Sequence, residues 1–269
     1  MLHPRFNDVC KLCRKLELNF VVLSNLTVCN QEKIDCLKRC RPQFVNVSLY
    51  SMNPTEHDAI TRVCGSWKRT MDGITNCLDA GIRVRLATPL LKRNKDAFLG
   101  LVTFAKEHNM ILTGSCVLIP KCDHDCANLS ESCSPSEMEG VLQRYKDVFD
   151  EGWNGDATVG LNDHVCEIGR TRIYLGATGT YYPCDSMHEY SLGNAEEVSL
   201  REIWGGREIA YLRNLRNRDF EKCSTCPERG YCKVCPAYNY NATGNLTEPI
   251  PNKCEIASVI HRVYGGSKC

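Results

Sequence analysis

The stretch "CSTCPERGYCKVC" (residues 223–235) places four cysteines within thirteen positions. It contains two C-x2-C pairs, and each pair presents two sulfurs from one tight turn, so both can reach the same metal centre. Disulfides, zinc and an iron-sulfur cluster are the candidates for what these residues hold. The chain has 19 cysteines in all, so the others bear on the choice.

Composition sets the class of protein. The chain has 269 residues, 43% hydrophobic and 24% charged residues, and a formal net charge of +1. This length supports a real core and more than one domain. Because the charge is nearly balanced, we expect no nucleic-acid partner. No apolar stretch approaches the ~20 residues of a membrane span, and no secretory signal pattern follows Met1. We therefore expect a cytoplasmic chain with no membrane partner, whose thiols stay reduced.

The first half alternates between two kinds of hydrophobic pattern. Helical periodicity predicts helices over 5–17, 31–40, 66–81 and 96–109, the third closed by a glycine. Apolar runs predict buried strands over 19–25, 44–51, 82–91 and 110–119, with a loop between the strand that ends at 51 and the helix that begins at 66. Such alternation is typical of parallel βα units in an open sheet or a barrel, where ligands bind at the carboxyl ends of the strands. A further helix is predicted over 134–150, with Ser136 as N-cap and Glu139 three positions on.

The second half carries the cysteines with ligand-like spacing: Cys166, Cys184, Cys223, Cys226, Cys232, Cys235 and Cys254. Zinc would be satisfied by four of them, which leaves Cys166, Cys184 and Cys254 unexplained. Iron-sulfur clusters bind thiolates that are distant in sequence, and so can use the whole set. Zinc remains the alternative on spacing alone.

A family resemblance favours the cluster. "CEIGRTRIYLGATGTYYPC" (166–184), "LGNAEEVSLREIW" (192–204), C-x2-C-x5-C-x2-C and Cys254 together resemble the SPASM domain of radical S-adenosylmethionine (SAM) enzymes. The family pattern has three residues, not two, in the interval that ends at Cys235. The segment 47–94 is similar to the middle of the radical SAM barrel, and the segment 2–25 is similar to the stretch that follows the glycine-rich GGEP motif of that family.

The resemblance implies an α/β fold: a partial radical SAM barrel that lacks its first units, followed by a small cysteine-rich SPASM domain. The implied domains are 1–135 (partial barrel), 136–160 (connecting helix and linker) and 161–269 (SPASM). It further implies two auxiliary 4Fe-4S clusters. One is held by Cys223, Cys226, Cys232 and Cys254, and the other by Cys166, Cys184 and Cys235 with an unidentified fourth ligand.

The function implied is radical chemistry on a peptide or protein substrate, started by a 5′-deoxyadenosyl radical from SAM. Electrons would come from a donor such as a flavodoxin or ferredoxin. By position in the family pattern, Asp185 matches a general base beside a cluster, and Ser48 matches a SAM-contacting hydroxyl. A solvated turn aspartate and a plain strand serine are the alternatives.

The C-x3-C-x2-C motif that binds the SAM-cleaving cluster does not occur in this sequence; Cys36 and Cys40 are followed only by Cys64. We expect a fragment of a complete enzyme. The alternative is a genuine short chain acting as an electron-transfer, zinc-binding or peptide-binding module. Buried free thiols are expected at Cys10, Cys13, Cys29, Cys36, Cys40, Cys64 and Cys77. A substrate-facing loop with incidental thiols is expected around Cys116, Cys122, Cys126 and Cys133, and a surface position for His164.

Overall fold

A computed structural model describes residues 1–149 and 159–265. The chain divides into two compact units. The first comprises Met1–Cys116 with Asp147–Phe149, and the second comprises 117–146 with the described residues from 159 onward. Most of the predicted linker at 151–160 lies outside the described residues, and the domain limits near 135 and 160 stay predictions.

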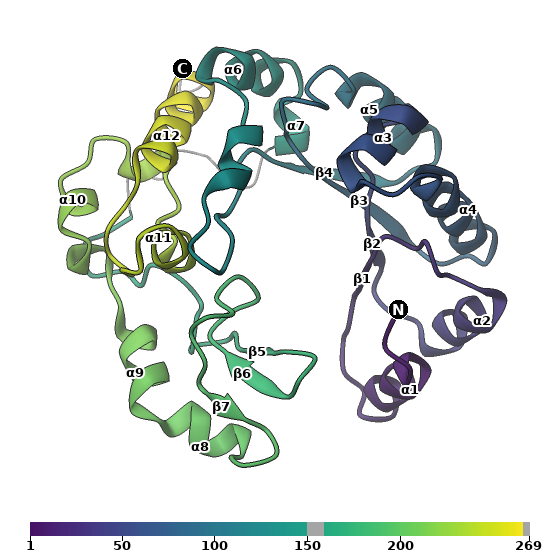
Figure 1. The fold of residues 1–269 in the computed structure, drawn as a ribbon, viewed down its shortest axis with the longest axis horizontal. Helices are drawn as coiled ribbons and strands as arrows, with labels where there is room; N and C mark the ends of the chain where they lie inside the picture. Colours follow the sequence, from purple (N-terminus) through teal and green to yellow (C-terminus); the bar gives the residue numbers. More distant parts are fainter. Residues whose placement is uncertain (150–158, 266–269) are drawn as a thin grey trace. The chain divides into compact units, whose positions relative to one another are not determined.

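The first unit is a parallel α/β sheet, as predicted (Figure 1). Its strands are β1 (Val22–Ser24), β2 (Val45–Ser48), β3 (Val84–Pro89) and β4 (Ile111–Ser115), hydrogen-bonded in chain order. All three strand pairings are parallel. The helices are α1 (Phe6–Lys15), α2 (Gln31–Cys40), α3 (Pro54–Thr61), α4 (Ser66–Asp79) and α5 (Phe98–Glu107).

The core of this unit follows from the strand pattern. Every second residue of β3 is buried, and Val47 and Leu86 on neighbouring strands are fully enclosed. In β4 a glycine is required, because a Cβ at Gly114 would overlap the ring of Phe149. The predicted glycine cap of the third helix is confirmed, since Gly81 follows α4 with φ of +72°.

Three local predictions were wrong. The strand at 19–25 is not buried throughout: β1 is the edge of the sheet, and Leu23 is 66% exposed. The predicted loop after 51 contains α3, whose N-cap Asn53 accepts a hydrogen bond from the Thr55 N–H at 2.9 Å, with Pro54 at the first helical position.

The helix over 134–150 is two helices, α6 (Pro135–Arg144) and α7 (Lys146–Phe149), and its N-cap is Ser134 rather than Ser136. Ser134 forms a capping box with Glu137. The sequence offers S-x-x-E twice, two residues apart, and Pro135 decides between them because proline favours the first position of a helix.

The second unit combines very short strands with several helices. An antiparallel sheet joins β5 (Tyr174–Leu175), β6 (Thr180–Tyr182) and β7 (Gly193–Asn194). The helices are α8 (Leu200–Gly205), α9 (Arg207–Asn214), α10 (Glu221–Ser224), α11 (Pro236–Thr243) and α12 (Pro251–Tyr264), with 3-10 turns at Ala127–Glu131, Asn217–Asp219 and Arg229–Tyr231. Helix α12 packs on α6, where Arg262 Nε lies 2.8 Å from Glu139 Oε2.

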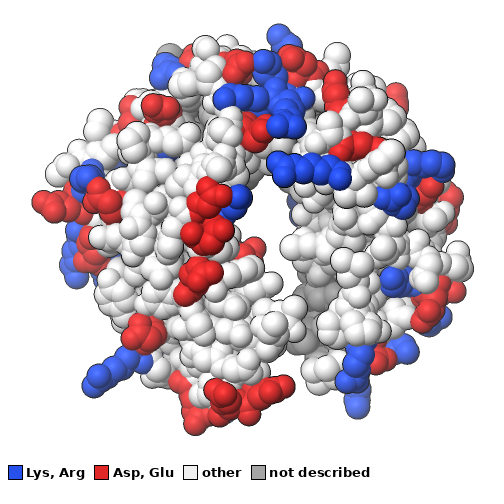
Figure 2. Space-filling view, viewed as in Figure 1, with Lys and Arg blue, Asp and Glu red and all other residues white. Residues whose placement is uncertain are grey.

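Both signs of charge occur on the visible surface. Figure 2 shows acidic and basic side chains in small groups over the face shown, in keeping with the net charge of +1. None of the helices in the described ranges is long and apolar enough to cross a membrane.

Candidate metal centre

Five of the seven predicted ligand cysteines line one cavity of about 600 Å³ in the second unit: Cys223, Cys226, Cys232, Cys235 and Cys254. They come from α10, the turns on either side of Arg229–Tyr231, the start of α11 and the first turn of α12. A backbone hydrogen bond from the Cys226 N–H to the Cys223 carbonyl, at 3.2 Å, forms the turn of the first C-x2-C pair. All seven predicted ligand cysteines are free thiols.

Cys223 has three other ligand candidates near it. Burial raises the pKa of the Cys223 thiol to about 11, and the nearby sulfurs of Cys232, Cys254 and Cys226 raise it further. Burial likewise raises the pKa of Cys232 and of Cys254; Cys226 is again among the repelling neighbours, and Cys235 is among those of Cys232. Without a bound cation, the Cys223, Cys232 and Cys254 thiols therefore favour the protonated form.

Lys253 is the one lysine with a buried side chain in the described part of this cavity wall, at 7% exposure. Its ammonium lies 5.6 Å from the centroid of the Tyr238 ring. It acts against burial at Cys232, Cys235 and Cys254, lowering the pKa of each thiol. A buried ammonium is costly unless negative charge lies close by, so this cation suits a cavity that holds an anionic group.

A second group consists of Cys166, Cys184 and Cys235. Burial raises the pKa of Cys184 to about 12, a Ser186 N–H donated to its sulfur opposes this, and Cys235 and Cys166 raise it again. Cys235 is the N-cap of α11, and its sulfur accepts the Tyr238 N–H at 3.4 Å. Burial raises the Cys235 pKa, while the N–H groups of Tyr238 and Ala237 favour the thiolate. The N-terminus of a helix stabilises a thiolate, because the helix dipole and the free N–H groups there favour negative charge.

The donor set fits iron-sulfur clusters. Across residues 1–149 and 159–265, no three His, Cys, Asp or Glu side chains are close enough to bind one metal ion. A 4Fe-4S cluster binds each thiolate through a different iron, so its ligands stand further apart than those of a single ion. Seven free thiols in two neighbouring groups, with a buried cation beside them, provide ligands of the required type.

Ser48 lies at a different cavity, in the first unit. At the carboxyl end of β2 it lines a hollow of about 670 Å³ with Ser24, Tyr50, His57 and Arg69. His57 is 1% exposed; burial lowers its pKa, and its Nδ1 accepts the Tyr50 N–H at 3.2 Å. This is the end of a parallel sheet where ligands bind. Asp185 is exposed and directly follows Cys184 in the second unit.

The remaining cysteines divide by burial. Cys10, Cys36, Cys40 and Cys77 are buried in the apolar core of the first unit, as predicted, and Cys36 Sγ lies 3.8 Å from Cys40 Sγ. Buried positions were wrong for Cys64, which is exposed, and for Cys13 and Cys29, which are half-buried. Cys64 lies in the turn between α3 and α4, beside Gly65. His164, predicted at the surface, is half-buried, and its Nδ1 is fully covered.

Sequence reasoning missed Lys253 and His57. Lysine beside a cysteine carries no signal of burial, since lysine is mostly exposed. His57 could have been found from the Asn53-Pro54 helix start, which places it in the first turns of α3, facing the end of β2.

Comparison with known proteins agrees with this geometry. The SPASM family, an iron-sulfur cluster-binding domain, matches residues 166–227. An AdoMet-dependent heme synthase of Methanosarcina barkeri is 24% identical over 93% of this chain and 78% of its own length. The subtilosin biosynthesis protein AlbA of Bacillus subtilis is 32% identical over 87% of this chain and 54% of its own length. A structure of anSMEcpe with bound AdoMet and a peptide has a TM-score of 0.70 at 14% identity, covering 96% of this chain and 78% of that one.

A parallel α/β sheet followed by a cysteine-rich SPASM region defines the class: an α/β protein of the radical SAM fold with an iron-sulfur cluster-binding extension. The chain is therefore similar to radical SAM/SPASM-type proteins, with its SPASM match at residues 166–227.

Proposed function

We propose that the chain holds two auxiliary 4Fe-4S clusters. Cys223, Cys226, Cys232 and Cys254 bind the first; Cys166, Cys184 and Cys235 bind the second. The observation that carries this proposal is the cavity of about 600 Å³ that Cys223, Cys226, Cys232, Cys235 and Cys254 line together, with the buried Lys253 in its wall. The division of the seven thiols into two sets is the one that the resemblance to the SPASM pattern implies.

The proposed activity is that of a maturase: modification of a peptide or protein substrate by radical SAM chemistry. Support comes from a relative named for bacteriocin biosynthesis and from a similar fold bound to AdoMet and a peptide. When bound, the auxiliary clusters would accept an electron from the substrate or anchor it. SAM enters the proposal only together with a C-x3-C-x2-C segment, which this sequence does not contain. The proposal also includes a flavodoxin- or ferredoxin-type electron donor and a location in the cytoplasm.

Three side chains receive roles. Lys253 offsets the negative charge of the thiolate ligands from within the protein. In this proposal Asp185, which is exposed beside Cys184, takes a proton from a substrate held at the second cluster. Ser48, which lines the cavity at the end of β2, donates a hydrogen bond to SAM. In a chain supplied with the C-x3-C-x2-C segment, Asp185→Asn is then expected to keep its iron and lose turnover, and Ser48→Ala to bind SAM more weakly in calorimetry with iron unchanged.

The test of cluster binding is metal analysis of the anaerobically reconstituted chain. We expect about eight irons and about eight acid-labile sulfides per chain, with broad absorbance near 400 nm. One zinc per chain with no sulfide would overturn the proposal, and would leave a zinc-stapled binding protein.

A further inference from the structure

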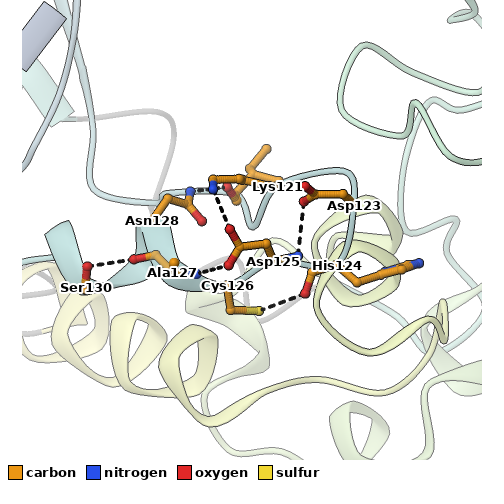
Figure 3. Close-up of polar contacts among 9 residues, drawn as sticks. Lys121, Asp123, His124, Asp125, Cys126, Ala127, Asn128 and Ser130 are labelled. Carbon is orange, nitrogen blue, oxygen red and sulfur yellow. Dashed lines mark hydrogen bonds and ion pairs between the residues drawn. The ribbon is translucent and has the colours of Figure 1, made fainter. Parts of the chain in front are cut away.

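The segment between Lys121 and Ser130 is a loop held in shape by its own contacts (Figure 3). Asp125 accepts a hydrogen bond from the Ala127 N–H at 2.7 Å and pairs with Lys121. Its own N–H donates to Asp123 Oδ1 at 3.2 Å. The Asn128 side chain donates to the Ile119 carbonyl at 2.8 Å. These contacts therefore fix the conformation of the loop and the positions of its side chains.

The two central thiols of this loop make different contacts. Cys126 Sγ turns back to the His124 carbonyl of its own loop at 4.0 Å, as Figure 3 shows. Cys122 Sγ instead reaches the carbonyl of Ser186 at 3.8 Å, 64 residues further along the chain. Of the pair, Cys122 is the one that hydrogen-bonds to the turn carrying Cys184, whereas Cys126 lies near the Tyr238 side chain of α11.

Ser186 joins Cys122 to a cluster ligand. Its N–H donates to the sulfur of Cys184, and its carbonyl accepts from the sulfur of Cys122. The two thiols thus lie at opposite ends of one residue's backbone. Cys184 belongs to the group that has only three cysteines.

A buried asparagine holds this arrangement on the helix that begins at Cys235. Asn241 of α11 has no exposed surface. Its amide nitrogen lies 3.0 Å from the Pro120 carbonyl, 2.7 Å from the Ser186 carbonyl and 3.9 Å from Cys122 Sγ. Its Oδ1 is buried without a hydrogen-bond partner in the described part of the chain. One side chain therefore ties the Cys122 loop, the Cys184 turn and α11 together.

From these contacts we propose that Cys122 is the fourth protein ligand of the cluster bound by Cys166, Cys184 and Cys235. The inference rests on the proposed function. Cys122 releases its proton to solvent, and the thiolate forms a sulfur-iron bond that displaces water or an external thiol from the fourth iron. No electron is gained or lost in this exchange.

The experiment compares anaerobically reconstituted wild type with Cys122→Ala, and with Cys126→Ala as the matched control from the same loop. An iron without a protein thiolate is the first to be lost on mild oxidation. After ferricyanide treatment, Cys122→Ala is expected to give a 3Fe-4S electron paramagnetic resonance signal of about one spin per chain. Wild type and Cys126→Ala are expected to give little of this 3Fe-4S signal. Cys122→Ser, which keeps a hydroxyl for the Ser186 contact, guards against misfolding and should behave like Cys122→Ala.

Four results would overturn the assignment. Two of them are a Cys122 variant that resists oxidation like wild type, and a wild type that already yields the full signal. A third is a signal raised by His164→Gln but by neither Cys122 variant, because the covered Nδ1 of His164 would then be the ligand. A wild type that binds no iron overturns both this assignment and the proposed function, whereas the first three leave two clusters in place.

Discussion

The two units use cysteine in opposite ways. Burial raises the pKa of Cys10 to about 12 in the first unit and of Cys223 to about 11 in the second, so the thiols alone look alike. Around Cys10 lie the apolar side chains of the core, with Cys36 and Cys40 among them. Around Cys223 lies a cavity of about 600 Å³ with a buried lysine in its wall. A raised thiol pKa therefore does not mark a metal site by itself, and the proposal for Cys223 rests on the cavity and the buried cation beside it.

The largest expected effect contrasts the two kinds of C-x2-C pair. Cys223→Ala/Cys226→Ala should lower the iron content of the reconstituted chain by about four atoms, because one cluster loses two ligands. The matched change Cys10→Ala/Cys13→Ala, with the same spacing on α1, should leave iron unchanged. If metal analysis found an equal loss of iron in both double variants, the two C-x2-C pairs would not differ in metal binding, contrary to the prediction.

A second prediction concerns what stabilises the first unit. Leu86→Ala should lower the free energy of unfolding by about 2–5 kcal/mol, because Leu86 is fully buried in the sheet. Removing the buried sulfur in Cys77→Ala should cost less, about 1 kcal/mol. Both are measured by denaturant unfolding. Loss of iron from either folded variant would contradict the separation of core thiols from ligand thiols.

The buried lysine gives a third prediction. In Lys253→Met the positive charge that favours the reduced cluster is gone, so the reduction potential of the cluster should fall by on the order of 50–100 mV, the size expected for a charge in the wall of the cavity at an effective dielectric of ~20. Lys222 lies in the same cavity wall and also lowers the pKa of the Cys254 thiol, but it is exposed and paired with Glu248, so water and salt screen its charge and it supplies the control. Lys222→Met should shift the potential far less in spectroelectrochemical titration. Equal shifts of the reduction potential in Lys253→Met and Lys222→Met would contradict a larger effect of the buried lysine.

The smallest effect is a pH dependence confined to the first unit. His57 has its pKa lowered by burial, so below about pH 6.5 the unfolded chain binds a proton that the folded chain resists. Stability is therefore lost as the pH falls through 6.5 toward the folded value, by at most about 1.4 kcal/mol per pH unit. Thermal unfolding between pH 7.5 and 5 measures this slope.

His57→Gln should flatten that slope, whereas His108→Gln at an exposed position should not. An unchanged slope in His57→Gln would remove His57 as its source.

Much of the first unit follows from sequence, because its helices and strands carry strong hydrophobic periodicity. The failures were positions where two local signals competed or a start signal was missed. Pro135 selects Ser134 over Ser136 as N-cap, and Asn53-Pro54 starts a helix within a predicted loop. The exposure of Leu23 depends on which strand is at the edge, and strand order is a tertiary property.

The grouping of the ligand cysteines could be predicted only through the family pattern, since spacing alone left zinc possible. Three features needed the folded chain: the burial of Lys253, the clamp made by Asn241, and the contact of Cys122 with Ser186. The last two join residues that are more than fifty positions apart, a distance at which no local signal exists.

The most direct test of the central claim is ⁵⁷Fe Mössbauer spectroscopy of the reconstituted chain, with iron counted per chain. The account predicts that about eight irons are present and that nearly all of them contribute the spectrum of 4Fe-4S clusters with sulfur ligands. Iron present only as isolated ions, or the absence of iron where zinc is bound instead, would contradict it.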